Sequence, residues 1–197
     1  MTKKVLIIGA TGSLGKTLRK YLLENTDYTL TLFSRSANRI NSIDSNREQT
    51  VTGNVLETDS LKILIEGHDA VFAALTGDLG NMAKSIVSAM EQTETTKLIF
   101  IASMGIYDEI PGEGNVSQNP MLRTYREAAD IVEASNLNYT VIRPGWFDNG
   151  SDVYETTVKG EPFGGHDVSR NSIADLAFRL IDDNNLYCRN SIGIHRP

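Results

Sequence analysis

One glycine-rich segment near the amino terminus constrains the fold of this chain more than any other feature. Residues 5–8 form a short run of apolar, mostly β-branched side chains, which is typical of a strand covered on both faces. The sequence Gly9-Ala-Thr-Gly-Ser-Leu-Gly15 follows at once, and apolar residues at helical spacing come next, from Leu14 to Leu22. A strand, a glycine-rich turn and a helix in this order predict a βα unit whose turn faces a ligand.

The spacing of the three glycines points to a phosphate group on that ligand. Gly9 permits a tight turn, Gly12 lets backbone N–H groups approach a pyrophosphate, and Gly15 allows the helix to pack closely on the strand. The amino terminus of the helix adds its partial positive charge. Contacts with the ligand are therefore expected from Gly9, Thr11, Gly12, Ser13, Leu14 and Gly15. A turn that binds nothing is the alternative. Hydrolysis of a nucleoside triphosphate is disfavoured because the glycines are spaced Gly-x-x-Gly-x-x-Gly, which is not the glycine spacing of a P-loop.

Strands and helices alternate along the rest of the chain. Further strands are expected at residues 28–33, 49–52, 69–75, 98–102, 139–142 and 192–194, and helices at 60–65, 82–90, 125–134 and 173–181. Repeated βα units imply parallel strands with right-handed crossovers. The sequence therefore predicts an α/β fold: one Rossmann-like domain over residues 1–197, with a doubly wound parallel sheet and a small substrate-side portion at about residues 144–197. Ligands of such sheets bind beyond the carboxyl ends of the strands.

Composition excludes several classes of function. The chain has 19 basic and 25 acidic residues, and its net charge of −6 disfavours a nucleic-acid partner. Cys188 is the single cysteine, so an internal disulfide is excluded, and no set of residues has metal-ligand spacing. No apolar run approaches the roughly 18 residues that span a bilayer, and the first apolar stretch is short for a secretory signal. We therefore expect a cytoplasmic protein that acts on a small molecule and not at a membrane. Nothing in the sequence specifies an oligomeric state.

Three further motifs carry a resemblance to a known family. They are Ser103-Met-Gly-Ile-Tyr107, Tyr139-Thr-Val-Ile-Arg-Pro-Gly145 and Val168-Ser-Arg170. With the glycine segment, they make the chain similar to atypical short-chain dehydrogenase/reductases, in particular to the NmrA-like, NAD(P)-binding group. The resemblance covers essentially the whole chain and implies that the backbone of Pro144 and Gly145 borders a nicotinamide. The group contains both reductases and non-catalytic sensors.

The end of the second expected strand predicts which dinucleotide binds. NAD-binding Rossmann units usually place an acid there for the ribose hydroxyls, whereas this chain has Ser34 and Arg35. Arg35 can pair with a 2′-phosphate and Ser34 can donate to it; Arg39 reaches the same phosphate if the segment turns helical. NADP(H) is therefore predicted in preference to NAD(H). Two ordinary surface arginines are the alternative.

The next two expected strands end in residues suited to the rest of the cofactor. Asn54 stands where the family that the chain resembles usually has Asp, and its amide can exchange hydrogen bonds with the adenine edge, next to Val55. Ala73, Ala74 and Leu75 end the following strand and leave room for the cofactor ribose. Core packing is another explanation for these three side chains, and both explanations can hold together.

The expected nicotinamide end departs from the usual reductase pattern. Short-chain reductases typically use a serine together with a Tyr-x-x-x-Lys pair, in which the lysine lowers the pKa of the tyrosine. Here Arg126 aligns with that lysine and Leu122 stands where the tyrosine is usual. Arg126 is suited to hold the nicotinamide ribose but is a poor proton shuttle. Ser103, which also lies beside the expected cofactor, and Tyr107 are the candidate catalytic residues. A turn hydroxyl and an aromatic residue at the rim are the alternatives.

Other residues near this end allow two interpretations each. Trp146 and Phe147 form either a flat apolar wall for a planar substrate or part of the core. Residues 108–119 are polar and form either a mobile lid or a plain surface loop. Of the histidines, His68 is expected at the surface, and His195, near the carboxyl terminus, is expected to have no role.

Two functions fit these observations. The first is an enzyme: an NAD(P)H-dependent oxidoreductase that uses NADPH to reduce a small planar or carbonyl acceptor, such as a flavin or a quinone. Solvent can supply the proton for such acceptors, so the missing Tyr–Lys pair is no obstacle. The second is a non-catalytic NADP(H) sensor of the NmrA kind, although the part of the chain after Arg143 is short for such a sensor. A nucleotide-sugar epimerase is set aside because it needs the Tyr–Lys pair and a sizeable C-terminal domain.

Overall fold

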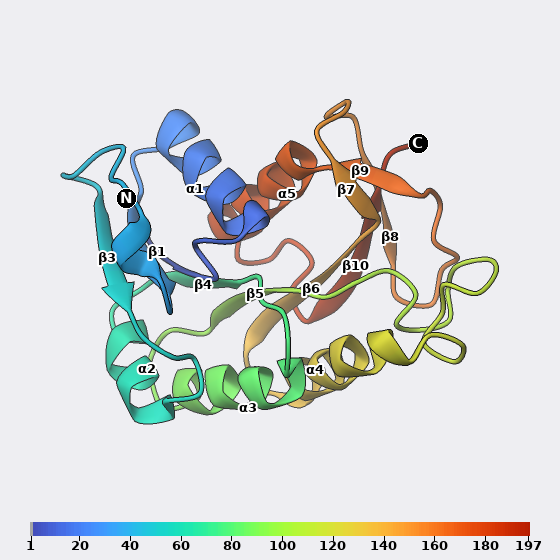
Figure 1. The fold of residues 1–197 in the computed structure, drawn as a ribbon, viewed down its shortest axis with the longest axis horizontal. Coiled ribbons are helices and arrows are strands. Elements are labelled where there is room, and N and C mark those ends of the chain that lie inside the picture. Colours follow the sequence, from blue (N-terminus) through green and yellow to red (C-terminus); the bar gives the residue numbers. More distant parts are fainter. Residues whose placement is uncertain (1) are drawn as a thin grey trace.

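The structure, a computed structural model, describes residues 2–197 and has three layers, with a sheet between two layers of helices (Figure 1). Within these residues the strands are β1 (Lys4–Ile8), β2 (Thr29–Ser34), β3 (Glu48–Thr52), β4 (Ala70–Ala73), β5 (Lys97–Ile101), β6 (Asn138–Pro144), β7 (Trp146–Asp148), β8 (Glu155–Val158), β9 (Asp167–Ser169) and β10 (Asn190–His195). The α-helices are α1 (Ser13–Asn25), α2 (Thr58–Ile65), α3 (Leu79–Met90), α4 (Arg123–Ala134) and α5 (Arg170–Asp182), and the short 3-10 helices are η1 (Ala37–Arg39) and η2 (Pro120–Leu122).

Eight of these strands form one sheet in the order β3-β2-β1-β4-β5-β6-β10-β8. The pairs from β3 to β10 are parallel, and β8 pairs antiparallel to β10 at one edge. The expected α/β fold with a doubly wound parallel sheet is therefore confirmed. The sequence did not predict β7, β8 or β9, because these strands are short and, apart from buried Val168 and Ser169 in β9, have exposed or half-buried side chains.

The central strands are mostly apolar because each strand contributes to two cores. Alternate side chains of a strand point to opposite faces. In β1, Val5 and Ile7 pack in the core beneath α1 and α5, whereas Leu6 and Ile8 pack in the core beneath α2, α3 and α4. This double covering explains why the first strand has no polar alternation.

The order of the strands leaves a crevice beyond β1 and β4. The chain adds β2 and β3 on one side of β1 and then returns to add β4, β5 and β6 on the other side. The connections on the two sides diverge, so the carboxyl ends of β1 and β4 border an opening in which ligands of such folds bind. The glycine-rich segment joins β1 to α1 and therefore lies at the carboxyl end of β1 (Figure 1).

The C-terminal part of the chain is joined to the main sheet and to the first helix. β10 lies between β6 and β8. The hydroxyl of Tyr21 on α1 donates to Asp175 on α5 at 2.6 Å, and that of Tyr28 donates to Asp182 at 2.6 Å. None of the helices that the structure describes between residues 2 and 197 is long and apolar enough to cross a membrane.

Two histidines make contacts that the sequence did not reveal. His68 is half-buried; its Nε2 lies 2.8 Å from Thr31 Oγ1, and burial lowers its pKa. His195 is only 2% exposed because it lies in β10 beneath Phe163, with ring centroids 5.2 Å apart. The sequence alone did not reveal the burial of His195, because a segment near the end of a chain becomes buried only when it pairs with a strand of a sheet.

Candidate functional site

Two positions in and just after the turn that follows β1 accept only glycine. Gly9 has a positive φ of 87°, and a Cβ there would lie 2.1 Å from the carbonyl oxygen of Ala74. Its N–H donates to the carbonyl of Phe33 at 3.0 Å, which ties the turn to the end of β2. A Cβ on Gly15 would lie 2.4 Å from the carbonyl oxygen of Gly9, so α1 packs directly on the turn.

The amino terminus of α1 is open and carries no counter-charge. Gly12 is the capping residue, with extended backbone angles, and no side chain of residues 2–197 caps the helix. The first turn also lacks acidic residues. The backbone N–H groups of this turn and the partial positive charge of the helix therefore face the crevice, which is the arrangement that binds a phosphate.

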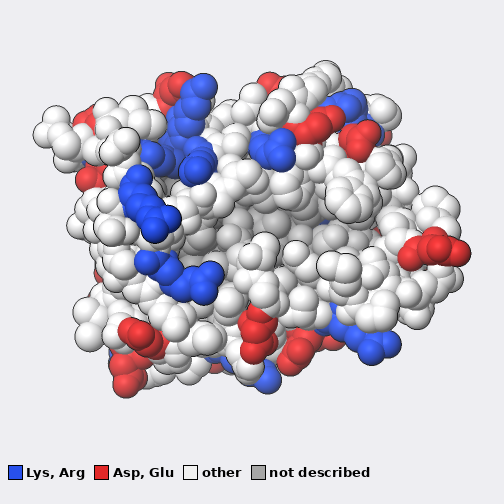
Figure 2. All heavy atoms as spheres, in the orientation of Figure 1, with Lys and Arg blue, Asp and Glu red and all other residues white. Residues whose placement is uncertain are grey.

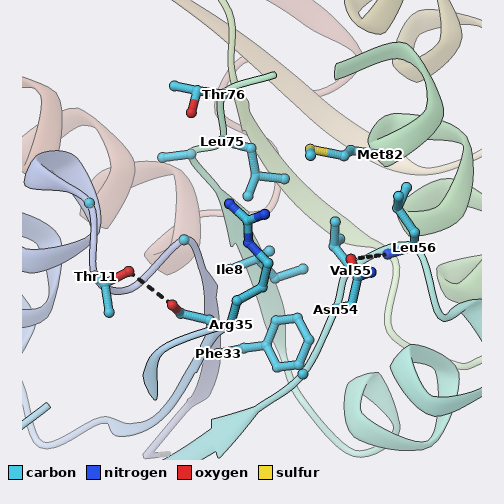
Figure 3. A pocket seen from close by; sticks show the side chains of 15 residues that line it. Ile8, Thr11, Phe33, Arg35, Asn54, Val55, Leu56, Leu75, Thr76 and Met82 are labelled. Carbon is cyan, nitrogen blue, oxygen red and sulfur yellow. Dashed lines mark hydrogen bonds between the residues drawn. The ribbon is translucent and has the colours of Figure 1, made fainter. Parts of the chain in front are cut away.

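A cleft of about 280 Å³ opens beside this turn (Figure 3). Its lining residues come from the ends of β1, β2, β3 and β4 and from α3: Ile8, Gly9, Thr11, Gly12, Phe33, Ser34, Arg35, Gly53, Asn54, Val55, Leu56, Ala74, Leu75, Thr76 and Met82. None of these residues is acidic. Arg35 is exposed, and its guanidinium extends across the cleft toward Leu75 (Figure 3). The surrounding face is hollowed in its middle, and basic side chains border the hollow on the side of α1 and β3 (Figure 2).

Two hydrogen bonds fix the polar walls of the cleft. Thr11 Oγ1 and Ser34 Oγ lie 2.9 Å apart and join the turn after β1 to the end of β2. Asn54 Oδ1 accepts from the N–H of Leu56 at 3.2 Å, which leaves the Asn54 amide nitrogen to donate. Both bonds are drawn in Figure 3. These two bonds orient the side chains of Thr11, Ser34 and Asn54 within the cleft wall.

The structure brings half of the predicted cofactor residues into this cleft: Gly9, Thr11, Gly12, Ser34, Arg35, Asn54, Val55, Ala74 and Leu75. It places others elsewhere. Leu14 and Ala73 are buried in the core, at 7% and 0% exposure, and do not line the cleft. Ser13 and Arg39 are exposed outside the lining. Leu14 is buried because it is one of the apolar residues at helical spacing in α1. Ala73 is buried because it belongs to β4, a strand that is covered on both faces.

Sequence reasoning missed several apolar residues of the cleft, namely Ile8, Phe33, Leu56 and Met82, together with Gly53 and Thr76. Phe33 precedes Ser34 directly, and a Cβ on Gly53 would lie 2.7 Å from its ring. The glycine was therefore a signal that a large side chain packs against this turn. Met82 gave no signal, because helical spacing alone cannot distinguish a core position from the rim of a cleft.

The expected nicotinamide end lies where β5 and β6 leave the sheet. Their pairing continues past the strands, since the N–H of Met104 donates to the carbonyl of Pro144 at 3.2 Å. This bond brings half-buried Ser103 beside Pro144 and Gly145. A Cβ on Gly145 would lie 2.3 Å from the carbonyl oxygen of His166, so glycine is required there as well.

The two aromatic residues that follow are exposed. Trp146 is 66% exposed and Phe147 is 39% exposed, so the interpretation that they are core residues is wrong. The guanidinium of Arg170 lies 5.0 Å from the centre of the Phe147 ring. Trp146 and Phe147 therefore offer flat apolar surface next to Gly145.

Tyr107 and Arg126 are both hydrogen-bonded to other residues of the protein. The Tyr107 hydroxyl donates to the carboxylate of Glu133 near the end of α4, and burial together with this carboxylate raises the pKa of Tyr107. Arg126 binds Asp130 at 2.8 Å and the carbonyl of Ile106 at 3.2 Å. Tyr107 is therefore not retained as a proton donor, and Arg126 is already engaged within the protein.

No group of three or more His, Cys, Asp or Glu residues in the part of the chain that the structure describes could hold a metal ion. The residues present do fit a dinucleotide. The open amino terminus of α1 suits a pyrophosphate, the apolar cleft walls suit an adenosine, and Arg35 suits a further phosphate.

Comparison with known proteins agrees with this geometry. The NAD(P)H-binding family matches residues 9–184. A Rossmann-fold NAD(P)-binding family protein from Shigella flexneri is 37% identical, with a TM-score of 0.85 over 100% of this chain and 95% of that one. A short-chain dehydrogenase/reductase from Veillonella parvula, solved in complex with NADP, is 27% identical, with a TM-score of 0.91 over 100% and 96% of the two chains. The uncharacterized sugar epimerase YhfK of Bacillus subtilis is 25% identical over 92% of this chain and 89% of its own length.

Proposed function

Because this chain belongs to the NAD(P)H-binding family, as its resemblance to atypical short-chain dehydrogenase/reductases implied, we propose that it is an NADPH-dependent reductase of a small planar or carbonyl acceptor. The observation that carries the proposal is the cleft beside α1. It combines an uncapped helix terminus with Arg35 and has no acidic lining residue. One similar protein is a short-chain dehydrogenase/reductase in complex with NADP and another is named as a sugar epimerase, so the choice of reductase rests on this chain's own residues.

The preference for NADPH rests on the end of β2. An acidic residue at this position would accept hydrogen bonds from the ribose hydroxyls of NAD and would repel a 2′-phosphate. This chain has Ser34 and Arg35 there, and both line the cleft. A guanidinium can pair with a phosphate through two parallel hydrogen bonds. Thr11, which is bonded to Ser34, holds that serine in place.

The type of acceptor follows from the other end of the site. When bound, NADPH supplies a hydride, and the chain's residues bind and orient the two reactants. Exposed Trp146 and Phe147 give a planar molecule a surface on which to stack. The buried Leu122 stands in place of the usual tyrosine, so the protein offers no phenol there as a proton donor. Flavins and quinones fit because they can take their proton from water.

The test is a pair of titrations with NADPH and NADH, read from the fluorescence of Trp146, followed by cofactor oxidation with a flavin and with a quinone. We expect tighter binding of NADPH and oxidation that depends on the acceptor. Binding without oxidation of NADPH by any acceptor would favour the sensor over the reductase. Binding of neither cofactor would refute the assignment of the cleft.

The substitution Arg35→Asp tests the cofactor preference directly. Charge-assisted hydrogen bonds contribute about 1.5–3 kcal/mol, so the affinity for NADPH should fall roughly 10- to 100-fold while that for NADH holds or rises. Arg39→Asp is the matched control, because it makes the same charge change four residues away and outside the lining of the cleft. An unchanged ratio of the two affinities in Arg35→Asp would contradict the assignment.

A further inference from the structure

A buried ion pair joins the loop after β5 to the end of β6 at the expected nicotinamide end. Glu109 lies in the loop after β5, and Arg143 lies in β6 just before Pro144. The carboxylate of Glu109 accepts from Arg143 Nη1, and their side chains are only 6% and 1% exposed. The sequence did not predict this pair, because its members are 34 residues apart and neither belongs to a spaced motif of charges.

The carboxylate of Glu109 also holds the backbone of its own loop. Oε1 accepts from the N–H of Gly105 at 3.1 Å, and Oε2 accepts from the N–H of Tyr107 at 2.8 Å. Gly105 has a φ of 81°, and a Cβ there would lie 2.3 Å from the carbonyl oxygen of Gly114. The loop that begins at Ser103 is thus a closed, tightly packed turn around one carboxylate.

Arg143 is fixed as firmly as its partner. Its Nε donates to Ser191 Oγ at 3.1 Å on the neighbouring strand β10. Its guanidinium lies 5.2 Å from the centre of the Tyr107 ring, whose hydroxyl is in turn held by Glu133. Glu109 is therefore bound to a cation that cannot move without disturbing the end of β6.

Burial of two charges is a weak way to gain stability, because desolvation offsets most of their attraction. The pair instead connects the parts of the chain that border the acceptor end: Ser103 through the loop, and Pro144 and Gly145 through β6. Fixed loops at this end are what a hydride transfer needs, since a misplacement of about 1 Å can lower a rate about 100-fold. The phosphate cleft lies at the ends of β1 to β4 and does not include the pair.

We propose that Glu109 and Arg143 are positioning residues that hold Ser103 and the Pro144–Gly145 backbone in place for reduction of the acceptor. This role rests on the proposed reductase function. It separates two properties of the site: the glycine-rich cleft determines cofactor affinity, and the Glu109–Arg143 pair determines the geometry at the reacting end.

The test substitutes Glu109→Gln and uses Glu113→Gln as the control. Glu113 is an exposed carboxylate in the same loop. In Glu109→Gln we expect kcat to fall about 10- to 100-fold with an unchanged Kd for NADPH, and hydrogen exchange at the amides of Gly105 and Tyr107 to become at least about tenfold faster. Ser191→Ala, which removes one hydrogen bond from Arg143 and leaves the ion pair, should change both quantities in the same direction by a smaller factor.

Other results would overturn the proposal. If kcat in Glu109→Gln equals that of Glu113→Gln, the pair does not position the reacting groups. If kcat and NADPH binding fall together with the folded fraction in both Glu109→Gln and Ser191→Ala, the pair has a structural role alone. A wild-type protein that oxidises no NADPH would refute the reductase function. Unchanged exchange at Gly105 and Tyr107 would refute the positioning role and leave the reductase function standing.

Discussion

Replacement of Gly9 by alanine tests whether the turn after β1 depends on the absence of a Cβ. Two costs add at this position. A positive φ costs a residue with a Cβ about 1–2 kcal/mol, and overpacking typically costs about 1–3 kcal/mol. The second cost applies because the new Cβ would lie 2.1 Å from the carbonyl oxygen of Ala74, which belongs to the backbone and cannot rotate away. We therefore expect Gly9→Ala to lower the free energy of unfolding by about 2–5 kcal/mol.

Gly67 provides the matched control. Its φ is 78°, close to that of Gly9, but a Cβ there would meet no atom within 4 Å. Gly67→Ala should therefore show the backbone cost alone, about 1–2 kcal/mol. In a domain of this size roughly 2–4 °C of Tm corresponds to each kcal/mol, so Tm should fall by about 2–8 °C in Gly67→Ala and by about 4–20 °C in Gly9→Ala.

The assay is thermal unfolding followed by circular dichroism, with and without NADPH. At about 100 times its Kd a ligand stabilises the folded state by about 2.7 kcal/mol. Wild type and Gly67→Ala should show this gain, whereas Gly9→Ala should lose part of it, because the N–H of Gly12 is bonded to the carbonyl of Gly9 at 2.9 Å. Equal destabilisation in the two variants would refute the steric argument, and an equal gain from NADPH would refute the link to the cofactor.

Two further predictions concern Gly12 and Glu48. Gly12→Ala should change stability by about 1 kcal/mol or less, because its φ of −73° suits any residue, but it should weaken NADPH binding about tenfold or more in a fluorescence titration. Equal binding by this variant and wild type would mean that no phosphate approaches Gly12. Burial alone would raise the pKa of Glu48, but Arg19 and the N–H groups of Asp44 and Ile43 lower it to about 2 from an ordinary value of 4.5. Its contribution to stability is therefore present above pH 4.5 and is lost as the pH falls toward 2. In urea unfolding, the advantage of wild type over Glu48→Gln should shrink across that range; a constant difference would contradict the assignment.

Much of the site could be predicted because its signals are local. Gly9 directly follows the buried strand β1, and Gly12 comes just before α1. The segment between them is short, so it must lie at the carboxyl end of the strand, beside the crevice. Arg35 follows β2 in the same way and lines the cleft. Arg39, four residues further on, was predicted to share this role but lies outside the lining, at the end of the short 3-10 helix η1. The prediction that a residue lines the cleft was therefore less reliable the further that residue stands from the end of a strand.

The acceptor end shows the same dependence on distance. Tyr107 stands further from the end of β5 than Arg39 does from the end of β2, and its hydroxyl donates to Glu133, which is 26 residues away. Trp146 and Phe147 are aromatic and were equally consistent with the core, and their exposure depends on the small sheet of β7 and β9. The strand β8 exists because β10 offers an edge with which it pairs, although its own residues are mostly polar.

The sequence by itself determined the fold class, the position of the glycine-rich turn and the candidate phosphate site. These follow from periodicity and from the steric demands of consecutive residues, which are properties of short segments. Only the tertiary structure decided which side chains meet at the acceptor end, where Glu109 finds Arg143 and Tyr107 finds Glu133. Such pairs depend on how segments far apart in the chain pack, and the free energy of a buried charge or hydroxyl depends on the partner that packing supplies.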